Sequence, residues 1–292
     1  MTTEQRASAA LHPPGSTASA GTYLRRLYAM RRYAWTDAKY RLSAETSNTV
    51  LGWLWYLIEP AAYITIFWFV FGFTLDVGRG TEDFVAFLTV GQLVYRHSVN
   101  AIQTSASALV TNQAIMRSFS FTRAVLPVTR ILSAALRFRF SLVVMCLVLP
   151  LMGASIRWTW ILILPVAAIQ VLMNLGIGML LAPAVTRFAD IRRSMQFGFQ
   201  ILFYTSGVFF PLEPFVIDRP YGTTLLNLAT LNPIYDLVQL ARWAMLGMRP
   251  TNALVVCLAT AAWTIGSLVV GFMVFLRSES RFGAAITVPV SP

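Results

Sequence analysis

Long apolar runs dominate the chain from about residue 50 onward. A helix rises about 1.5 Å per residue, so roughly 20 apolar residues cross a hydrocarbon core about 30 Å thick. The pattern predicts an all-α integral membrane protein with a single membrane domain over 21–280. Its six predicted spanning helices lie at about 50–75, 84–110, 125–152, 158–183, 195–212 and 252–276.

The second of these stretches is unusually polar, and the fifth is short, ending near Pro211. Polar and charged side chains are costly in lipid, so the second stretch either faces protein or water, or lies partly outside the membrane. The polar side chains are Gln92, Arg96, His97 and Asn100.

The two ends of the chain are predicted to be tails, at 1–20 and 281–292. Residues 1–20 are polar and lack the apolar core of a secretory signal, so we expect them to be disordered. Residues 21–35 favour an amphipathic helix lying in the membrane interface, with an ordinary cytoplasmic amphipathic helix as the alternative. Its apolar side would carry Leu24, Leu27, Tyr28 and Trp35.

A proline-rich stretch, 213–247, precedes the last span. Asn232 can cap a helix that begins at Pro233, and Gly247 supplies its C-terminal stop. The helices are too short to span, so we expect a re-entrant pair that dips into the outer leaflet and packs against protein. The two predicted helices are 223–231 and 233–246.

The basic residues indicate an orientation, because Lys and Arg concentrate on the cytoplasmic side. Both termini should be cytoplasmic, in a multi-pass protein of the bacterial plasma membrane. The predicted inner set is Arg6, Arg25, Arg26, Arg31, Arg32, Lys39, Arg41, Arg117, Arg123, Arg187, Arg192, Arg193, Arg277 and Arg281. The smaller outer set is Arg79, Arg157, Arg219, Arg242 and Arg249.

Composition supports a membrane protein. The chain is 57% hydrophobic and 12% charged, whereas soluble domains average about 25% charged. Its net charge of +11 would suit nucleic-acid binding, but the arginines lie at the ends of apolar runs, so we predict no nucleic-acid partner. Cys146 and Cys257 lie inside apolar runs and are interpreted as membrane-core side chains.

The sequence contains no recognisable catalytic machinery. A P-loop ends in Gly-Lys-Ser/Thr, but the single lysine, Lys39, follows Ala38. The carboxylates are scattered, which argues against a membrane enzyme that holds Mg²⁺, and no metal site is predicted. An ion-coupled transporter remains an alternative because of Glu59, which precedes Pro60 in the first span.

Four local patterns occur in order along the chain. They are Asp37 to Arg41 with Leu51 to Trp55 and Pro60; Asn112, Ile115 and Phe121 to Arg123 with Leu126 and Pro127; Arg187 to Ile191 with Ser206 to Pro211; and Leu231 to Ile234 with Arg242, Leu246 and Gly247. Together they resemble the permease subunits of ABC-2 type transporters, most closely the Wzm-like exporters of O-antigen, teichoic acid or galactan. The resemblance covers about 21–280.

The resemblance implies a homodimer that works with two separate nucleotide-binding subunits. Mg-ATP would bind those subunits, and this chain would carry no cofactor of its own. Cytoplasmic segments at about 36–48, 112–123 and 184–193 would couple ATPase motion to helix motion. The candidate coupling residues are Tyr40, Arg41, Glu45, Arg117, Arg123 and Asp190, with membrane topology and headgroup contact as the alternative role of each arginine.

The resemblance also implies a pore between two copies, lined by the first and fifth spans. Aromatic rings can stack on sugars and let them slide, and lipid-facing aromatic belts are the alternative. The candidates are Tyr56, Tyr63, Phe67, Phe199 and Phe203 for the channel, and Asn232 and Pro233 for an outer gate. The head of a polyprenyl pyrophosphate carrier, or of an anionic membrane lipid, would meet Arg25, Arg26, Arg31 and Arg32.

The function predicted is therefore export of a lipid-linked polysaccharide. The strong bias towards arginine suggests a GC-rich genome and favours an actinobacterial galactan precursor. The alternatives are an ABC-2 exporter of a small hydrophobic compound, which would need an apolar lateral pocket, and a polytopic enzyme of polysaccharide assembly. Glu59 could bend the helix with Pro60, line the pore, or pair with Arg137 or Arg139; the roles of Arg96 and His97 stay open.

Overall fold

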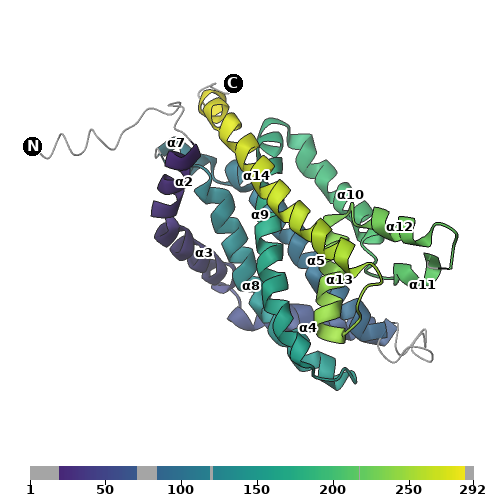
Figure 1. Cartoon of the computed structure of the whole chain (residues 1–292). Helices are drawn as coiled ribbons and strands as arrows, with labels where there is room; N and C mark the ends of the chain where they lie inside the picture. The colour runs from purple at the N-terminus through teal and green to yellow at the C-terminus, as the bar shows by residue number, and fades with distance from the viewer. Residues whose placement is uncertain (1–19, 71–83, 119–120, 217, 287–292) are drawn as a thin grey trace, which may run out of the picture.

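The computed structural model describes residues 20–70, 84–118, 121–216 and 218–286, and its regular elements there are all helices (Figure 1). Four long helices form the centre of the molecule. They are α5 (Phe84–Ala106), α8 (Val125–Leu151), α9 (Ile163–Arg187) and α14 (Ala253–Ile286). The predicted all-α fold class is confirmed for these residues. Of the predicted tails, 1–20 and 281–292, residues 1–19 and 287–292 lie outside the described residues, whereas Ala20 belongs to α2 and 281–286 continue α14.

α9 runs through the middle of this group and packs against α14, α5 and α8. Small residues permit the closest of these approaches. A Cβ atom added to Gly271 of α14 would collide with the carbonyl oxygen of Gly176 on α9, and one added to Gly178 would collide with Ser105 of α5. Close backbone approach through small residues is typical of helix packing in membranes.

Four helical segments of the described chain are long and apolar enough to cross a membrane, which supports a multi-pass membrane protein. They are Gly52–Val70, Val125–Leu151, Trp158–Arg187 and Ala253–Glu279. They correspond to the predicted first, third, fourth and sixth spans, and the third, fourth and sixth coincide closely. The first comprises a short 3₁₀ helix, η1 (Gly52–Leu54), and α4 (Trp55–Phe67); its predicted end at 71–75 lies outside the described residues.

The predicted second and fifth spans are helices, α5 and α10 (Ala189–Thr205), but neither belongs to the four apolar segments. A six-span topology therefore stays a prediction. The predicted bounds of the fifth span, 195–212, are wrong, because the helix begins and ends several residues earlier. Asp190 lies in its first turn, and Gly207, with φ +61°, follows its C-cap, Ser206.

The predicted single helix at 21–35 is two helices, α2 (Ala20–Ala29) and α3 (Arg31–Thr46), separated at Met30. Tyr23 of α2 is buried, whereas Leu24 and Tyr28 are exposed. α3 packs along α8, and the Ser133 hydroxyl donates to the Ala38 carbonyl at 3.3 Å. Placement of this segment in a membrane interface stays a prediction.

The predicted helical pair before the last span is present, with bounds close to the predicted 223–231 and 233–246. After α11 (Leu212–Val216) come α12 (Gly222–Ala229) and α13 (Pro233–Leu246). The Asn232 side chain accepts a hydrogen bond from the Ile234 amide, and Gly247 ends α13 in the left-handed conformation at φ 73°. α13 packs against α5 and α14, while its depth in a membrane stays a prediction.

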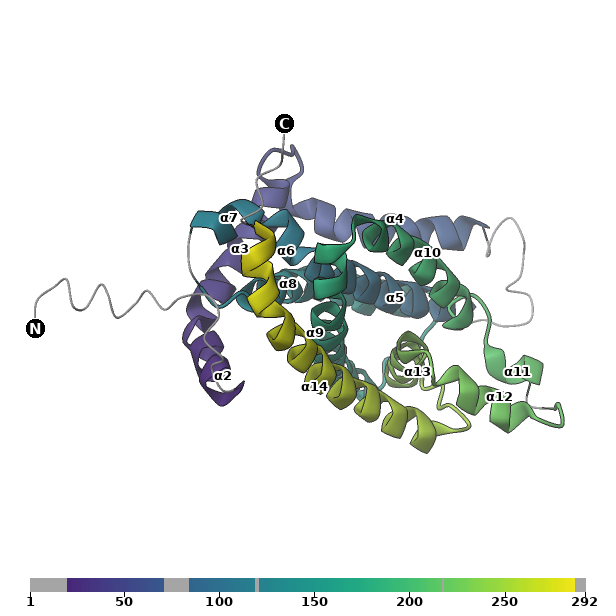
Figure 2. The ribbon, with the colours of Figure 1, turned by 90° about the horizontal axis from the view of Figure 1, so that it is seen from above.

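The two described chain ends lie at the same end of the molecule. Figures 1 and 2 show α2, α7 (Gln113–Ser118) and the end of α14 together, with α11 and α12 at the opposite end. α6 (Ala108–Thr111) joins α5 to α7 at the first end. We call this the terminal end and the other the distal end. Because both described chain ends lie at the terminal end, the chain passes between the two ends of the molecule an even number of times, which agrees with the predicted topology.

Candidate functional site

A polar cavity of about 130 Å³ lies between α4, α5 and α8. It is bordered by residues from all three helices, which the packing of α5 and α4 against α8 brings together. Its charged and polar wall is formed by Tyr56, Glu59, Tyr63, Arg96, His97, Asn100, Arg137 and Ser141. Among the described residues, no three His, Cys, Asp or Glu side chains form a group that could hold a metal ion.

An ion pair between Arg96 of α5 and Glu59 of α4 lies at one edge of this cavity. The Nη2 and Oε1 atoms are 3.0 Å apart, and the guanidinium carbon lies 3.8 Å from the ring centroid of Tyr63. The side chains are 39% and 52% exposed, so the pair is on the face of the bundle. The structure thus gives Glu59 a partner other than Arg137 or Arg139.

A second ion pair, Arg137 with Glu45, joins α8 to the end of α3. The Tyr56 hydroxyl donates to the Leu42 carbonyl at 2.7 Å and to Glu45 Oε2 at 3.1 Å. Glu45, predicted to couple to the ATPase, and Tyr56, predicted to line a channel, therefore belong to one contact. In a single chain this contact fastens α3 to α4 and α8.

His97 fills the interior side of the same cavity. Its ring stacks on Phe138 with centroids 4.0 Å apart and an interplanar angle of 9°, and the residue is buried. Stacking on an aromatic ring gives it a packing role beside Arg137. We call the two ion pairs with Tyr56 and Tyr63 the polar tract; it runs from the end of α3 along α4.

Arg41 makes a further link at the terminal end of the tract. Its Nε donates to Asp37 at 2.7 Å and its Nη2 to the Asn112 side-chain oxygen at 3.0 Å. Asn112 in turn donates to the Ala108 carbonyl at 2.6 Å. Arg41 therefore connects α3 to α6, whereas the neighbouring candidate Tyr40 is 72% exposed.

Arg123, another predicted coupling residue, connects three distant segments. Its amide and its guanidinium donate to the Oε1 and the carbonyl oxygen of Glu279 at 3.2 and 2.9 Å. The Ala124 amide donates to the Tyr23 hydroxyl at 3.2 Å, and burial, with the nearby Glu279 charge, raises the pKa of Tyr23. We call this contact of α2, the start of α8 and α14 the terminal clasp.

The remaining predicted terminal residues are on the surface. Asp190 is exposed in the first turn of α10, and Arg117 is on α7, with its side chain outside the described residues. The four candidate lipid-head residues are all exposed on α2 and the start of α3, and Arg31 lies over the Tyr28 ring. These four are Arg25, Arg26, Arg31 and Arg32.

The predicted channel aromatics are divided between α4, which carries Tyr56, Tyr63 and Phe67, and α10, which carries Phe199 and Phe203. α5 packs against both helices. Phe203 lies on Tyr95 of α5, with ring centroids 4.9 Å apart, and the Tyr95 hydroxyl donates to the Phe199 carbonyl. Phe67 packs against the main core cluster. A pore lined jointly by these five aromatic residues stays a prediction for two copies.

Arg242 on α13 is buried and holds three segments of the chain together. From the sequence it was assigned to the outer set of basic residues. It is 2% exposed and donates to the carbonyls of Gly207 and Val208 at 2.9 Å, and to that of Phe87 at 3.3 Å. Its guanidinium lies over the Phe87 ring. It thus fastens α13 to α5 and to the end of α10. The available signals were its place in the fourth motif of the resemblance and its position on a largely apolar helix.

The predicted gate residue Asn232 is part of the same junction. Its Nδ2 donates to the Ser206 hydroxyl at 2.8 Å and to the Thr205 hydroxyl at 3.1 Å. Together with its capping bond to Ile234, this joins the end of α10 to the start of α13. Pro233 occupies the first turn of that helix. A gating role for the pair stays a prediction.

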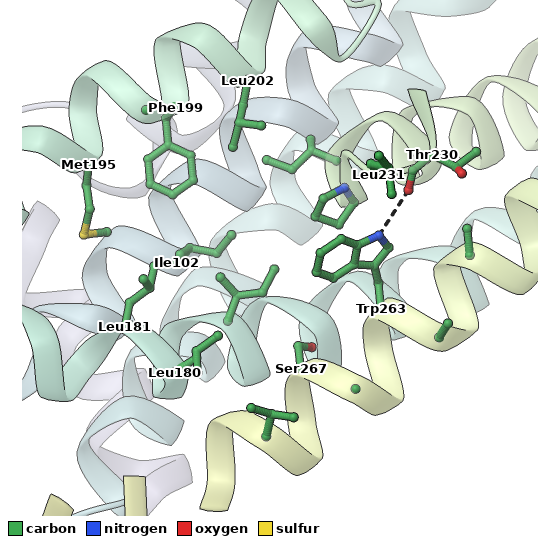
Figure 3. Close-up of a pocket in the computed structure, with 18 of the residues that line it drawn as sticks. Ile102, Leu180, Leu181, Met195, Phe199, Leu202, Thr230, Leu231, Trp263 and Ser267 are labelled. Carbon is green, nitrogen blue, oxygen red and sulfur yellow. Dashed lines mark hydrogen bonds between the residues drawn. The ribbon is translucent and has the colours of Figure 1, made fainter. Parts of the chain in front are cut away.

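A second cavity, larger than the polar one, has a different character. It measures about 950 Å³ and lies between α9, α10, α14 and the start of α13, with an almost wholly apolar wall (Figure 3). Phe199, predicted to line a sugar channel, points into it beside Met195 and Leu202. The apolar lateral pocket expected of a hydrophobic-compound exporter is therefore present.

Comparison with known proteins gives relatives of a single kind, although no family model matches the chain. The O-antigen export system permease protein RfbA of Klebsiella pneumoniae is 22% identical over 242 residues, covering 82% of this chain and 90% of that protein. The polysialic acid transport protein KpsM of Escherichia coli is 25% identical over 201 residues, covering 67% and 74%.

One relative is named for O-antigen export and the other for polysialic acid transport, and each alignment covers two thirds or more of both chains. The resemblance predicted from short motifs is therefore confirmed at the level of whole chains. This chain is similar to the ABC-2 type, Wzm-like permeases of polysaccharide export.

Proposed function

We propose that the chain is the pore-forming permease subunit of an ABC transporter that exports a polyprenyl-pyrophosphate-linked polysaccharide across the bacterial plasma membrane. Two copies would form the pore, and two nucleotide-binding subunits would supply the energy from Mg-ATP. Both termini would face the cytoplasm. An actinobacterial galactan precursor is the substrate that the arginine-rich composition favours, and the O-antigen and polysialic acid relatives support the broader class.

The half-exposed ion pair between Arg96 and Glu59 is the observation that carries this proposal. Glu59 lies seven residues, or about 10 Å, from the start of the helical segment at Gly52, so it sits within the apolar span. Charged side chains at such depth face protein or water rather than lipid. Because the pair is on the face of the bundle, it supports a polar path alongside α4.

The links at the terminal end support coupling to a separate ATPase. Arg41 ties α3 to α6, and the terminal clasp ties α2 and α8 to α14. A push on α6 or α7 would reach α3 through Arg41 and then α4 through the contact of Glu45 with Tyr56. Transmission through packed elements with specific side-chain links is the physical requirement for such coupling.

The second candidate function is export of a small hydrophobic compound, favoured by the apolar cavity of about 950 Å³. Depletion of the chain in its host separates the two. Polysaccharide export predicts that polyprenyl-linked polymer accumulates on the inner face while surface polymer falls, and that Glu59→Gln restores less surface polymer than the wild-type chain. Unchanged glycans on both faces would favour the hydrophobic compound, and loss of polymer synthesis would favour an enzyme.

A further inference from the structure

The apolar cavity is large enough to hold a ligand and is built from several helices. α10 contributes Phe199 and Gly198, α14 contributes Trp263 and Gly266, and α9 contributes Leu180. Its volume of about 950 Å³ lies at the upper end of the roughly 300–1,000 Å³ of typical ligand sites. Ile201 and Leu231 in its wall are 66% and 68% exposed, so the cavity opens on the surface of the helices and its apolar wall is accessible to a hydrocarbon.

The polar groups in its wall are already satisfied. Figure 3 shows the indole nitrogen of Trp263 bonded to the Thr230 carbonyl, at 3.1 Å. The Thr230 hydroxyl donates to the Asn227 carbonyl at 2.6 Å, and the Ser267 hydroxyl donates to the Thr264 carbonyl at 3.2 Å. The lining residues include no charged side chain. Such a wall suits a hydrocarbon, because its polar side chains are already hydrogen-bonded within the protein.

Three arginines extend the lining faces of the cavity towards the terminal end. Positions seven apart on a helix share a face, and each arginine is seven positions from a lining residue. The pairs are Leu180 with Arg187 on α9, Phe199 with Arg192 on α10, and Val270 with Arg277 on α14. All three arginines are exposed, and none forms an ion pair with another residue in the described part of the chain.

The cavity extends too far from these cations for the chain of an ordinary phospholipid. Its distal lining residue on α14 is Ala259, which is about 27 Å along the helix from Arg277. One leaflet is about half of a 30 Å hydrocarbon core, so an acyl chain anchored at Arg277 fills only the nearer part. A longer chain can reach from the arginines to the far end.

We propose that this cavity binds the polyisoprenoid tail of an anionic polyprenyl phosphate or pyrophosphate, with the phosphate held by Arg187, Arg192 and Arg277. The inference rests on the proposed function and deepens it, since it places the carrier's tail in a site separate from the polar tract. A helix of a second copy would cover the apolar wall but leave the three cations without an anion. Arginine is well suited to phosphate recognition.

The two glycines that face the cavity allow a direct test. A Cβ atom added to Gly198 or to Gly266 meets no other atom within 4 Å, so leucine at either position fills the cavity from one wall while the helices stay packed. The full-length chain, in lipid nanodiscs, is exposed to a polyprenyl phosphate that carries a photoreactive group in its tail. Labelled peptides are then identified by mass spectrometry.

The proposal predicts labelling on α10 and α14 at the lining residues, competed by unlabelled polyprenyl phosphate and not by phosphatidylglycerol. Gly266→Leu and Gly198→Leu should each reduce labelling at least tenfold, with Gly266→Ala as the matched control that leaves most of the space. Arg192→Gln and Arg277→Gln should each weaken competition by unlabelled polyprenyl phosphate about fivefold, the effect of one basic residue near an anionic surface. Arg249→Gln, at an exposed distal arginine, should change nothing.

Equal competition by phosphatidylglycerol would overturn the proposal in favour of a phospholipid site. Labelling elsewhere, or labelling unaffected by both leucine variants, would also overturn it. A disulfide between two copies carrying Gly266→Cys, with no labelling, would assign the cavity to a subunit interface. The export assay is independent: if depletion of the chain leaves export intact while labelling occurs as predicted, the proposed function fails and the site stands.

Discussion

Arg96 and Glu59 are 37 positions apart in the sequence, yet their charged groups meet at 3.0 Å on the face formed by α4 and α5. This pairing joins the polar side chains of α4, the predicted first span, to those of α5, the predicted second span. It also explains how α5 can carry an arginine on the face of the bundle without exposing an unpaired charge to lipid. The function of the pair can be tested by exchanging its charges.

Neutralising one partner should reduce export about tenfold, because the other charge is left without its ion-pair partner beside the proposed polar path. Glu59→Gln and Arg96→Gln would each show this loss. The exchange Glu59→Arg with Arg96→Glu should recover much of it, since an arginine at position 59 lies one turn from Tyr63 and can still stack on that ring. Surface polymer in a depleted host is the measurement.

The control for this exchange is Asp218→Asn, at an exposed carboxylate near the distal end. It should leave surface polymer unchanged. If the double exchange performs no better than either single variant, the pair is not the unit on which export depends.

Arg242 should be essential for stability, because it donates to the carbonyl groups of three buried residues, Phe87, Gly207 and Val208. Arg242→Ala leaves those carbonyls unsatisfied and should lower the free energy of unfolding by about 3 kcal/mol or more. Gly91→Ala should also lower the free energy of unfolding, in this case through a steric clash, since its Cβ would lie 2.6 Å from Arg242 Nη2. Thermal unfolding in detergent measures both. Arg249→Ala, at an exposed arginine of the same region, should shift the midpoint little.

Asn232 makes two kinds of contact that substitution can separate. Asn232→Ala removes both the cap of α13 and the link to Ser206, and a lost cap alone costs about 1 kcal/mol. Asn232→Asp keeps an oxygen that can cap the helix but loses the amide donor. If the link between α10 and α13 contributes to stability, the aspartate variant should be at least as unstable as the alanine variant. If the aspartate variant instead has the stability of the wild-type chain, Asn232 acts only as the cap of α13.

The terminal clasp should control how firmly α2 is held. Glu279→Ala removes the Oε1 that accepts from the Arg123 amide, and α2 should then detach more often. Tryptic cleavage after Arg25 or Arg26 should accelerate several-fold, followed by gel electrophoresis over time. Ser278→Ala is the control, because its hydroxyl donates within its own helix to the Val274 carbonyl. An unchanged cleavage rate in Glu279→Ala would show that α2 is held by apolar packing alone.

Local signals predicted the part of the fold that local chemistry determines. Asn232, Pro233 and Gly247 define both ends of α13 because capping and left-handed termination involve only neighbouring residues. The bounds of α10 were missed because Arg192 and Arg193 made its first turns look like a loop, although they are helical. The break at Met30 had no comparable signal, since neither glycine nor proline marks it.

The candidate site was harder to predict, because its contacts join residues from separate helices. The sequence offered Glu59 several cations, and only the packing of α5 against α4 selects Arg96. Likewise, Arg137 pairs with Glu45 because α3 runs along α8. Phe199 was assigned to a sugar path for its aromaticity, yet the rotation of α10 turns it towards an apolar cavity. These outcomes depend on tertiary packing, which periodicity alone does not determine.

The most direct test of the account is transport by the purified chain. It would be reconstituted in liposomes together with the host's nucleotide-binding subunit and a polyprenyl-linked polysaccharide, and the polymer protected from an added glycan hydrolase would be measured. We predict that protection requires ATP and this chain, and falls in Glu59→Gln. Unchanged polymer accessibility in the presence of ATP, with both subunits folded and assembled, would contradict the proposal that this chain is the export path.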